Sequence, residues 1–581
     1  MPNGSNVPRW NLDSIYTTFD SEEYKNDFAH LKERITSFND ILKECVDEPG
    51  EYLVRCIQAL EAAHTYAENL SAYAEAVYTT NTRDERALQE INTLETVCLP
   101  LKAATVNFRQ LLLKYRHAAQ GEQLHAYRFF IEESLEKAKH SMSPKEEALA
   151  DDLLRTGGDA WTRLHESLTA TLSVTWDLRE QKTVTELREL AYSPDRTIRE
   201  KAYHAELTAW ESLEIPLAAC LNGVKGWALS IDSRRKWKNA VKKSIFLSRI
   251  NEKTLKALIT TAEYALPLFQ RYLKAKAKLL GIPKCTFYDL FAPVGNSRQW
   301  TWEEAQSFIV QQFSNFDPNM GIFAQKAFDS QWIDAEGHEG KVGGAYCTSF
   351  PLRGESRILC NFDGSFDSVT TVAHELGHAW HYECIKDLPH TDRQYPMTLA
   401  ETASTFAETI VFEGALQHET EPLALIENNL KDCCQVLVDI LCRFYFEKAL
   451  FEERSSAECS PQRLCELMLE SQQKTYGDAL DSAYLHPYMW AVKSHYYSVA
   501  LPFYNYPYAF GQLFSISLYT QAQEKDFAQR YRALLRITGS ASCEDVAQKA
   551  GFNITTPIFW KQAVSVIRQR VQAFEKLARK K

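Results

Sequence analysis

Apolar residues recur at three- and four-residue spacing along most of the chain, which is the pattern of helices that bury one face. The stretch from residue 251 to residue 281 is representative. Asn251 is a favourable N-cap, an apolar stripe follows it, and Gly281 before Ile282-Pro283 predicts the end of the helix. The stripe consists of Leu255, Leu258, Ile259, Ala262 and Leu266. The pattern therefore predicts a mainly α fold.

Three stretches depart from helical spacing and predict small, local sheets. Alternating or β-branched residues occupy positions 172–185, 345–350 and 358–362. Turn-forming residues at Gly157-Gly158 and Ser193-Pro194-Asp195 precede a return to long helical patterns, so a division near residue 195 is favoured. We expect an N-terminal helical lobe with a small hairpin over residues 1–195 and a second domain over residues 196–581.

Composition and charge exclude several classes of protein. With 45% apolar and 24% charged residues, the 581-residue chain is typical of a globular protein with a large core. Sixty-five Lys and Arg against 76 Asp and Glu leave a net charge of -11, the wrong sign for binding the phosphates of nucleic acid. A run without charged residues between Lys493 and Glu524 is interrupted by Pro502, Pro507 and Gly511, so we expect no membrane span there.

The cysteines and the N-terminal residues predict a cytoplasmic protein. Fourteen cysteines are scattered along the chain without a Cys-x-x-Cys pair, so we expect reduced and mostly buried thiols. The first residues, Met1-Pro2-Asn3-Gly4-Ser5, lack the basic and apolar regions of a secretory signal.

The strongest chemical signal is a His-Glu-x-x-His motif in a helical pattern, formed by His374, Glu375 and His378. Residues at i and i+4 share a helix face, so both imidazoles can bind one Zn²⁺. Glu375 lies one step round the helix, where it can reach a water molecule without competing for the metal. Asp363-Gly364-Ser365 supplies turn and N-cap residues at the right distance before this helix. The alternative, two surface histidines on an amphipathic helix, explains less of this context.

A catalytic zinc usually has three protein ligands, and two residues compete for the third position. His381 lies on the same face at i+7, but about 10 Å along the helix axis from His374, which places a shared metal beyond easy reach. Glu401 begins a second helical pattern and is the ligand that we favour. Its alternative role is a capping box with Thr398. Glu408, two turns after Glu401, is expected to share its face and to support a ligand by hydrogen bonding.

Aromatic residues are concentrated between Tyr484 and Tyr519. His495 and at least one of three tyrosines, Tyr504, Tyr506 and Tyr508, are candidates for donating hydrogen bonds to an oxyanion or for gripping peptide side chains. Packing in the core is the alternative for any single tyrosine.

These residues together resemble oligoendopeptidase F, in the M3 family of zinc metallopeptidases that includes thimet oligopeptidase and neurolysin. The resemblance spans nearly the whole chain, from residues 8–12 through residues 287–293 and the His-Glu-Leu-Gly-His helix to the C-terminal tyrosines. Its most specific piece is the segment 397–404, where Glu401 matches the third zinc ligand of the family.

The resemblance implies a two-lobed, multi-helical body that encloses a deep active-site channel, with a small β-sheet beside the zinc helix. It implies that residues 196–581 form the catalytic domain, and that Gly344, Tyr346 and the strand at 358–362 flank the substrate cleft. It further implies that His495 and Tyr508 stabilise the tetrahedral intermediate, with Tyr504 and Tyr506 near the substrate. The chain departs from the family pattern at Lys493-Ser494, where an apolar residue and a proline are expected.

The sequence therefore predicts a zinc-dependent endopeptidase that hydrolyses internal bonds of short peptides, with one Zn²⁺ held by His374, His378 and Glu401 and with Glu375 as general base. Two alternatives stay open at this point. One is a zinc amidase or esterase that acts on a non-peptide substrate, and the other is a helical peptide-binding scaffold without catalysis. The oligomeric state and the cleavage preference do not follow from the sequence.

Overall fold

The computed structural model describes residues 7–177, 180–295 and 298–580, and the contacts of the chain divide it into two compact units. The first unit draws on Met1–His140, Arg298–His418 and Leu518–Phe552. The second draws on Ser141–Ser297, Glu419–Ser517 and Asn553–Lys581. Each unit therefore combines segments that are distant in sequence. The boundary predicted near residue 195 lies inside the second unit, and the division into lobes at that residue stays a prediction.

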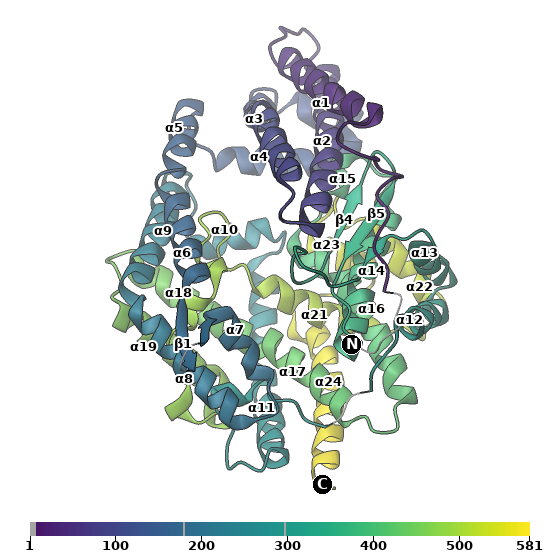
Figure 1. Ribbon diagram of the computed structural model, residues 1–581. Coiled ribbons are helices and arrows are strands. Elements are labelled where there is room, and N and C mark those ends of the chain that lie inside the picture. The colour runs from purple at the N-terminus through teal and green to yellow at the C-terminus, as the bar shows by residue number, and fades with distance from the viewer. Residues whose placement is uncertain (1–6, 178–179, 296–297, 581) are drawn as a thin grey trace. The chain divides into compact units, whose positions relative to one another are not determined.

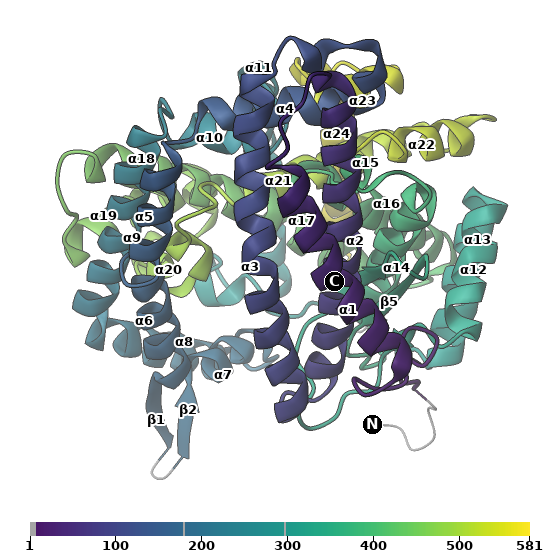
Figure 2. The ribbon, with the colours of Figure 1, turned by 90° about the horizontal axis from the view of Figure 1, so that it is seen from above.

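The prediction of a mainly helical protein is confirmed, and helices make up most of both units (Figure 1). In the first unit, α1, α2 and α3 run side by side (Figure 2) and enclose a core that includes Leu31, Leu53 and Phe108. The helices that belong to this unit are α1 Glu22–Ile41, α2 Pro49–Thr80, α3 Glu85–Lys114, α4 Arg128–Lys139, α12 Trp302–Phe316, α13 Pro318–Asp329, α14 Phe366–Ile385, α15 His390–Arg393, α16 Met397–His418, α22 Phe527–Leu535 and α23 Cys543–Lys549.

The second unit contains the long helix α11, which confirms the helix predicted between residues 251 and 281. It spans Glu252–Leu279, the side chain of Asn251 accepts a hydrogen bond from the Thr254 amide, and Gly281 adopts a positive φ of 68° after its end. The other helices of this unit are α5 Pro144–Leu154, α6 Gly158–Thr171, α7 Val184–Glu189, α8 Arg196–Ser212, α9 Glu214–Arg234, α10 Ala240–Leu247, α17 Leu423–Cys434, α18 Ile440–Arg454, α19 Pro461–Tyr476, α20 Met489–Val492 and α24 Pro557–Ala578. Helix α21, Tyr506–Tyr519, starts in this unit and ends in the first.

Two small sheets lie where the alternating patterns predicted them. Strands β1 Ser173–Asp177 and β2 Glu180–Thr183 form an antiparallel pair in the second unit. In the first unit, β4 Tyr346–Phe350 pairs antiparallel with β5 Glu355–Leu359, and the short β3 Ile333–Asp334 runs parallel to β5. The strand expected at 358–362 starts and ends earlier than predicted, as β5. Strand β3 was not predicted, because two residues are too few to show an alternating pattern.

The sheet of the first unit packs against α14, the helix that carries the His-Glu-x-x-His motif. Both β4 and β5 contact α14, and the two strands lie beside it in Figure 1. The strand order is β3-β5-β4, so β4 forms an edge of the sheet. The predicted small sheet beside the motif helix is therefore present.

Helices α14 and α16 pack closely because Gly377 has no side chain. A Cβ atom added to Gly377 would lie 2.6 Å from the Ala403 carbonyl oxygen and 2.6 Å from the Ser404 Cα atom, both on the backbone of α16. Backbone atoms cannot move aside as the end of a flexible side chain can. Gly377 therefore sets how near α16 comes to the two motif histidines.

We expect Gly377→Ala to lower the free energy of unfolding by about 1–3 kcal/mol, because the added methyl group must push α14 and α16 apart. Urea unfolding followed by circular dichroism measures this effect. Gly337→Ala is a suitable control, since a Cβ there meets only the Asn361 side chain at 3.7 Å. Equal stability of the two variants would contradict the close packing described here.

None of the helices in the described ranges combines the length and apolar character that crossing a bilayer requires. All fourteen cysteines lie within the described residues, where they are free thiols and mostly buried.

Candidate metal centre

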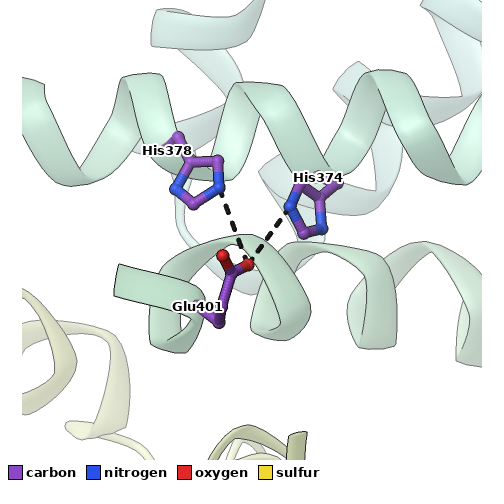
Figure 3. A group of neighbouring side chains, drawn as sticks. All are labelled: His374, His378 and Glu401. Carbon is purple, nitrogen blue, oxygen red and sulfur yellow. Dashed lines mark ion pairs between the residues drawn. The ribbon is translucent and has the colours of Figure 1, made fainter. Parts of the chain in front are cut away.

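The two motif histidines lie on α14, and the residues just before this helix fix where it begins. Ser365 caps this helix by accepting a hydrogen bond from the Ser368 amide, and Asp363 accepts one from the Ser365 amide at 2.9 Å. The rings of His374 and His378, one turn apart, project from the same side of α14 toward α16 (Figure 3), and their centroids are 4.9 Å apart. The local i, i+4 spacing is therefore sufficient to bring both imidazoles together.

Glu401 reaches the same point from α16. Its Oε2 atom lies 3.3 Å from Nε2 of His374 and 3.7 Å from Nε2 of His378 (Figure 3). Ser404, one turn later on α16, donates a hydrogen bond to Oε2 at 2.8 Å and holds the carboxylate in this direction. One donor atom from each of the three residues lies within 4.8 Å of the other two. The structure thus brings together the three predicted ligands, whose role as ligands stays a prediction.

This set of donors fits Zn²⁺. Two imidazole nitrogens and one carboxylate oxygen form the His₂Glu combination of a catalytic zinc site, which leaves a fourth position open. Burial alone would raise the pKa of Glu401, but His374 and His378 outweigh it and hold this pKa at about 2, so the carboxylate is ionised. Burial and the charge of His374 lower the pKa of His378 to about 4, so its imidazole is neutral and has a lone pair to share.

The charge around His374 also favours a cation. Burial would lower the pKa of His374, yet the carboxylates of Glu408 and Glu401 overcome this effect and raise it well above its usual value. Surroundings that stabilise a proton on this ring would stabilise a divalent cation at the same place.

Glu375 lies beside the three donors in a buried position. Burial raises the pKa of its carboxyl to about 7, and the charges of Glu401 and Glu408 add to this effect against the opposing charge of His374. Its side chain is not one of the three converging groups. A carboxyl group with such a pKa can take up and release a proton near neutral pH, and the role of Glu375 as general base stays a prediction.

His381 occupies a separate position and does not join this group. It is fully buried, its Nε2 atom is 2.8 Å from Oγ1 of Thr538, and its ring stacks on Tyr395 at 4.2 Å between centroids. The expectation that His381 lies beyond the reach of a shared metal agrees with this placement.

Glu408 supports the centre through His374, as predicted from its spacing after Glu401. Its Oε1 atom contacts Nδ1 of His374, on the ring edge opposite the Nε2 atom that faces Glu401. Such a contact fixes the orientation of a ligating imidazole and increases its basicity.

We therefore expect Glu408→Gln to weaken zinc binding about 10–100-fold without abolishing it, which is the usual effect of losing a carboxylate behind a ligating histidine. Competition with a fluorescent zinc chelator measures the affinity. Glu421→Gln is a control, since Glu421 is exposed and follows the end of α16. An affinity equal to that of the control would exclude this supporting role.

The residues predicted to flank the substrate lie in the same unit as the metal centre. Gly344 adopts a positive φ of 83° two residues before the start of the edge strand β4, and its carbonyl oxygen accepts a hydrogen bond from Asn361. Tyr346 begins β4, and its hydroxyl lies 2.6 Å from Oγ1 of Thr79 on α2. Contact of either residue with substrate stays a prediction.

His495 and the predicted tyrosines belong to the second unit. The His495 ring stacks near that of Tyr504 at 6.0 Å between centroids, and the hydroxyls of Tyr504 and Tyr508 are 3.0 Å apart. Burial, together with the nearby charges of Arg443 and Lys493, lowers the pKa of His495 to about 2, so its imidazole is neutral. Its buried Nε2 atom has no hydrogen-bond partner among the described residues. A neutral imidazole can donate a hydrogen bond to an oxyanion, and this role of His495 stays a prediction.

Tyr506 differs from the other two tyrosines. It is 2% exposed, and its hydroxyl forms hydrogen bonds with Ser248 at 2.9 Å and Ser244 at 3.1 Å. This environment favours packing over contact with substrate for Tyr506.

Two residues with clear roles at the centre were not predicted. Ser404 orients Glu401, and its i+3 position after a candidate ligand is a signal that could have identified it. Gly377 allows α16 to approach α14 closely. The residues around Gly377 in the sequence do not distinguish it from an ordinary glycine within a helix.

Comparison with known proteins shows which proteins this chain is similar to. Residues 189–566 match the sequence profile of "Peptidase family M3", and residues 114–173 match that of "Oligopeptidase F". Oligopeptidase PepF of Bacillus subtilis is 24% identical over 79% of this chain and 70% of its own length. An oligoendopeptidase F homolog of Lactococcus lactis is 25% identical over 98% of this chain and 97% of its own length. The crystal structure of oligoendopeptidase-F from Enterococcus faecium has the same fold, with a TM-score of 0.71, 19% identity and coverage of 96% and 99% of the two chains.

Proposed function

The chain belongs to peptidase family M3, and from that premise we propose that it is a zinc-dependent endopeptidase that hydrolyses internal peptide bonds of short oligopeptides. Its membership in this family makes the chain a metallo-oligopeptidase. The observation that carries the proposal is the convergence of His374, His378 and Glu401 beside the buried carboxyl of Glu375.

In this proposal, His374, His378 and Glu401 hold the cation, with Glu408 and Ser404 orienting the first and third of these residues. A bound Zn²⁺ supplies Lewis acidity, which polarises the scissile carbonyl group and makes a water molecule more acidic. Co²⁺ and Mn²⁺ accept the same imidazole and carboxylate donors, so metal analysis must accompany any assay of activity.

Glu375 performs both proton transfers. It first removes a proton from the attacking water molecule and then donates it to the nitrogen of the leaving amine. Burial raises the pKa of the Glu375 carboxyl, which makes its carboxylate a stronger base toward the water molecule, and the acid so formed can return the proton to the amine. The burial that raises this pKa also keeps bulk water from competing for the proton.

The edge strand β4 provides a means of binding peptides with little sequence demand. An extended backbone can pair with an exposed strand edge, while Gly344 leaves room for it and Tyr346 contributes an aromatic surface. His495, Tyr508 and Tyr504 are proposed to donate hydrogen bonds to the oxyanion and to hold the substrate. An active-site channel that admits short peptides and excludes folded proteins, and a cytoplasmic location, complete the proposal.

The proposal is tested by measuring metal content and by digesting peptides of graded length. We expect about one zinc ion per chain, cleavage at internal bonds of peptides of about ten residues as read by mass spectrometry, and no cleavage of a folded protein. Zinc-dependent hydrolysis of simple amides or esters, with peptides left intact, would instead indicate an amidase or esterase. Absence of bound metal and of cleavage would leave only a binding scaffold.

A further inference from the structure

A cavity of about 460 Å³ lies wholly within the second unit. Its walls come from α7, from α8, from the 3₁₀ turn Phe287–Asp289 and from the end of α20. Aromatic side chains line much of it, namely Tyr192, Tyr203, Phe287, Tyr288 and Phe291. A cavity of this size and composition is suited to a small organic molecule.

Three cationic and two acidic side chains also line the cavity, but most of them already have partners. Arg188 pairs with Glu206 at 2.6 Å, and His486 lies 3.2 Å from the same carboxylate. Arg199 pairs with Asp289 at 2.9 Å behind the wall. Glu189, the second acidic residue, is exposed. The lining thus carries one cation more than it carries carboxylates.

Lys493 is the cation without a partner. Within the described ranges, no residue forms a hydrogen bond or an ion pair with its ammonium group. The two acidic groups whose charges act on it, Asp439 and Glu206, form ion pairs with Arg443 and Arg188 respectively. Burial, reinforced by the positive charge of Arg443, lowers the pKa of Lys493 to about 7. An unpaired ammonium group in such a place is costly, and a negative charge brought to it would be stabilised strongly.

We propose that this cavity binds an organic carboxylate with an aromatic or apolar body, the carboxylate at Lys493 and the body against the aromatic walls. A carboxylate supplies the single negative charge that Lys493 lacks. The rings of Tyr192 and Phe291, 5.0 Å apart, and those of Phe287 and Tyr288 offer flat apolar surfaces that an inorganic anion would leave unused. The C-terminal end of a peptide and a free aromatic acid share this chemistry.

The inference goes beyond the proposed peptidase function, because none of the residues that line the cavity belongs to the candidate metal centre. It also concerns the position at which this chain departs from its family pattern, Lys493-Ser494. Although the charge of Lys493 reaches His495, binding of a carboxylate at the cavity is measured without any hydrolysis, so the failure of this proposal and the failure of the proposed peptidase function can be told apart.

Calorimetric titration of the zinc-loaded, full-length protein with N-acetyl-L-phenylalanine at pH 6 tests the proposal. We expect measurable binding that Lys493→Gln weakens at least about tenfold, that Lys493→Arg restores in part, and that the matched exposed-site variant Lys253→Gln leaves unchanged. The parent protein should bind the primary amide of the same compound no more tightly than Lys493→Gln binds the acid. The tripeptide Gly-Gly-Phe, compared with the free acid, distinguishes a peptide terminus from a free acid as the preferred source.

Three results would overturn the proposal. Equal affinity of the parent protein and Lys493→Gln for the acid would place the binding elsewhere, including at the metal. Equal affinity for the acid and its amide would exclude charge recognition. Binding of inorganic phosphate without binding of the acid would exclude an organic carboxylate. Urea unfolding of each variant guards against a folding defect, and we expect Lys493→Gln to be about as stable as the parent because the half-buried ammonium group of Lys493 forms no ion pair that the change would remove.

Discussion

Glu375→Gln should leave the zinc content of the protein unchanged and lower kcat/KM for peptide cleavage by about 10³-fold or more. The amide has nearly the shape of the carboxyl group but cannot accept a proton from water at neutral pH, so both proton transfers are lost. Glu375 is not one of the three donors that converge at the centre, so the metal should remain. An internally quenched peptide of about ten residues reports the rate, and atomic absorption reports the zinc.

Glu383→Gln is the matched control for this variant. Glu383 lies on the same helix, where its carboxylate pairs with Lys386 at 2.8 Å, and the chemical change is identical. We expect near-normal activity from the control. If Glu375→Gln retained comparable turnover, another group would have to act as the base and the proposed mechanism would be wrong.

The second large effect is expected for Glu401→Ala, which should weaken zinc binding by at least about 100-fold and reduce activity in proportion to the zinc lost. This change removes one of three protein donors and the negative charge that helps to stabilise a cation between His374 and His378. Equilibrium dialysis against a chelator of known affinity measures the loss. Addition of excess zinc should restore part of the activity.

The order of the three carboxylate variants separates direct ligation from indirect support. Glu401→Ala should cost more zinc affinity than Glu408→Gln, and Glu375→Gln should cost little or none. Ser404→Ala, which removes only the hydrogen bond at 2.8 Å to Glu401, should have a smaller effect than the loss of Glu401 itself. Unchanged zinc occupancy in Glu401→Ala would move the third ligand to another residue.

Local features of the candidate centre were accessible from the sequence because they depend only on helix geometry. His374 and His378 face the same way since they are one helical turn apart, and Ser365 caps their helix in the place predicted. The same reasoning placed Glu408 near the centre from its spacing after Glu401, and its contact with His374 agrees. The departure from the family pattern at Lys493 was also visible in the sequence, but the position of this residue in the wall of an aromatic cavity was not.

Features that depend on contacts between distant segments required the structure. Glu401 was favoured over His381 from the sequence, but only the structure shows that α16 passes close to α14 at Gly377 and that His381 lies beside Thr538 instead. The burial of Tyr506 against Ser244 and Ser248 separates it from Tyr504 and Tyr508, although all three lie in one Tyr-x-Tyr-x-Tyr run. The pKa of about 7 for Glu375 likewise arises from the surroundings and not from its place in the motif.

Amino-acid order alone was thus enough to predict the helical character, the motif helix and its two histidines, because these follow from periodicity and short spacings along one chain. Glu401 was added as the favoured third ligand, and its match to the family's ligand is what the resemblance implies. The tertiary structure decided which candidate donors meet, which tyrosines are buried, and that Lys493 has no acidic partner among the described residues. The physical reason is that burial and charge pairing are set by segments far apart in sequence, and spacing along the chain carries no information about which of them come into contact.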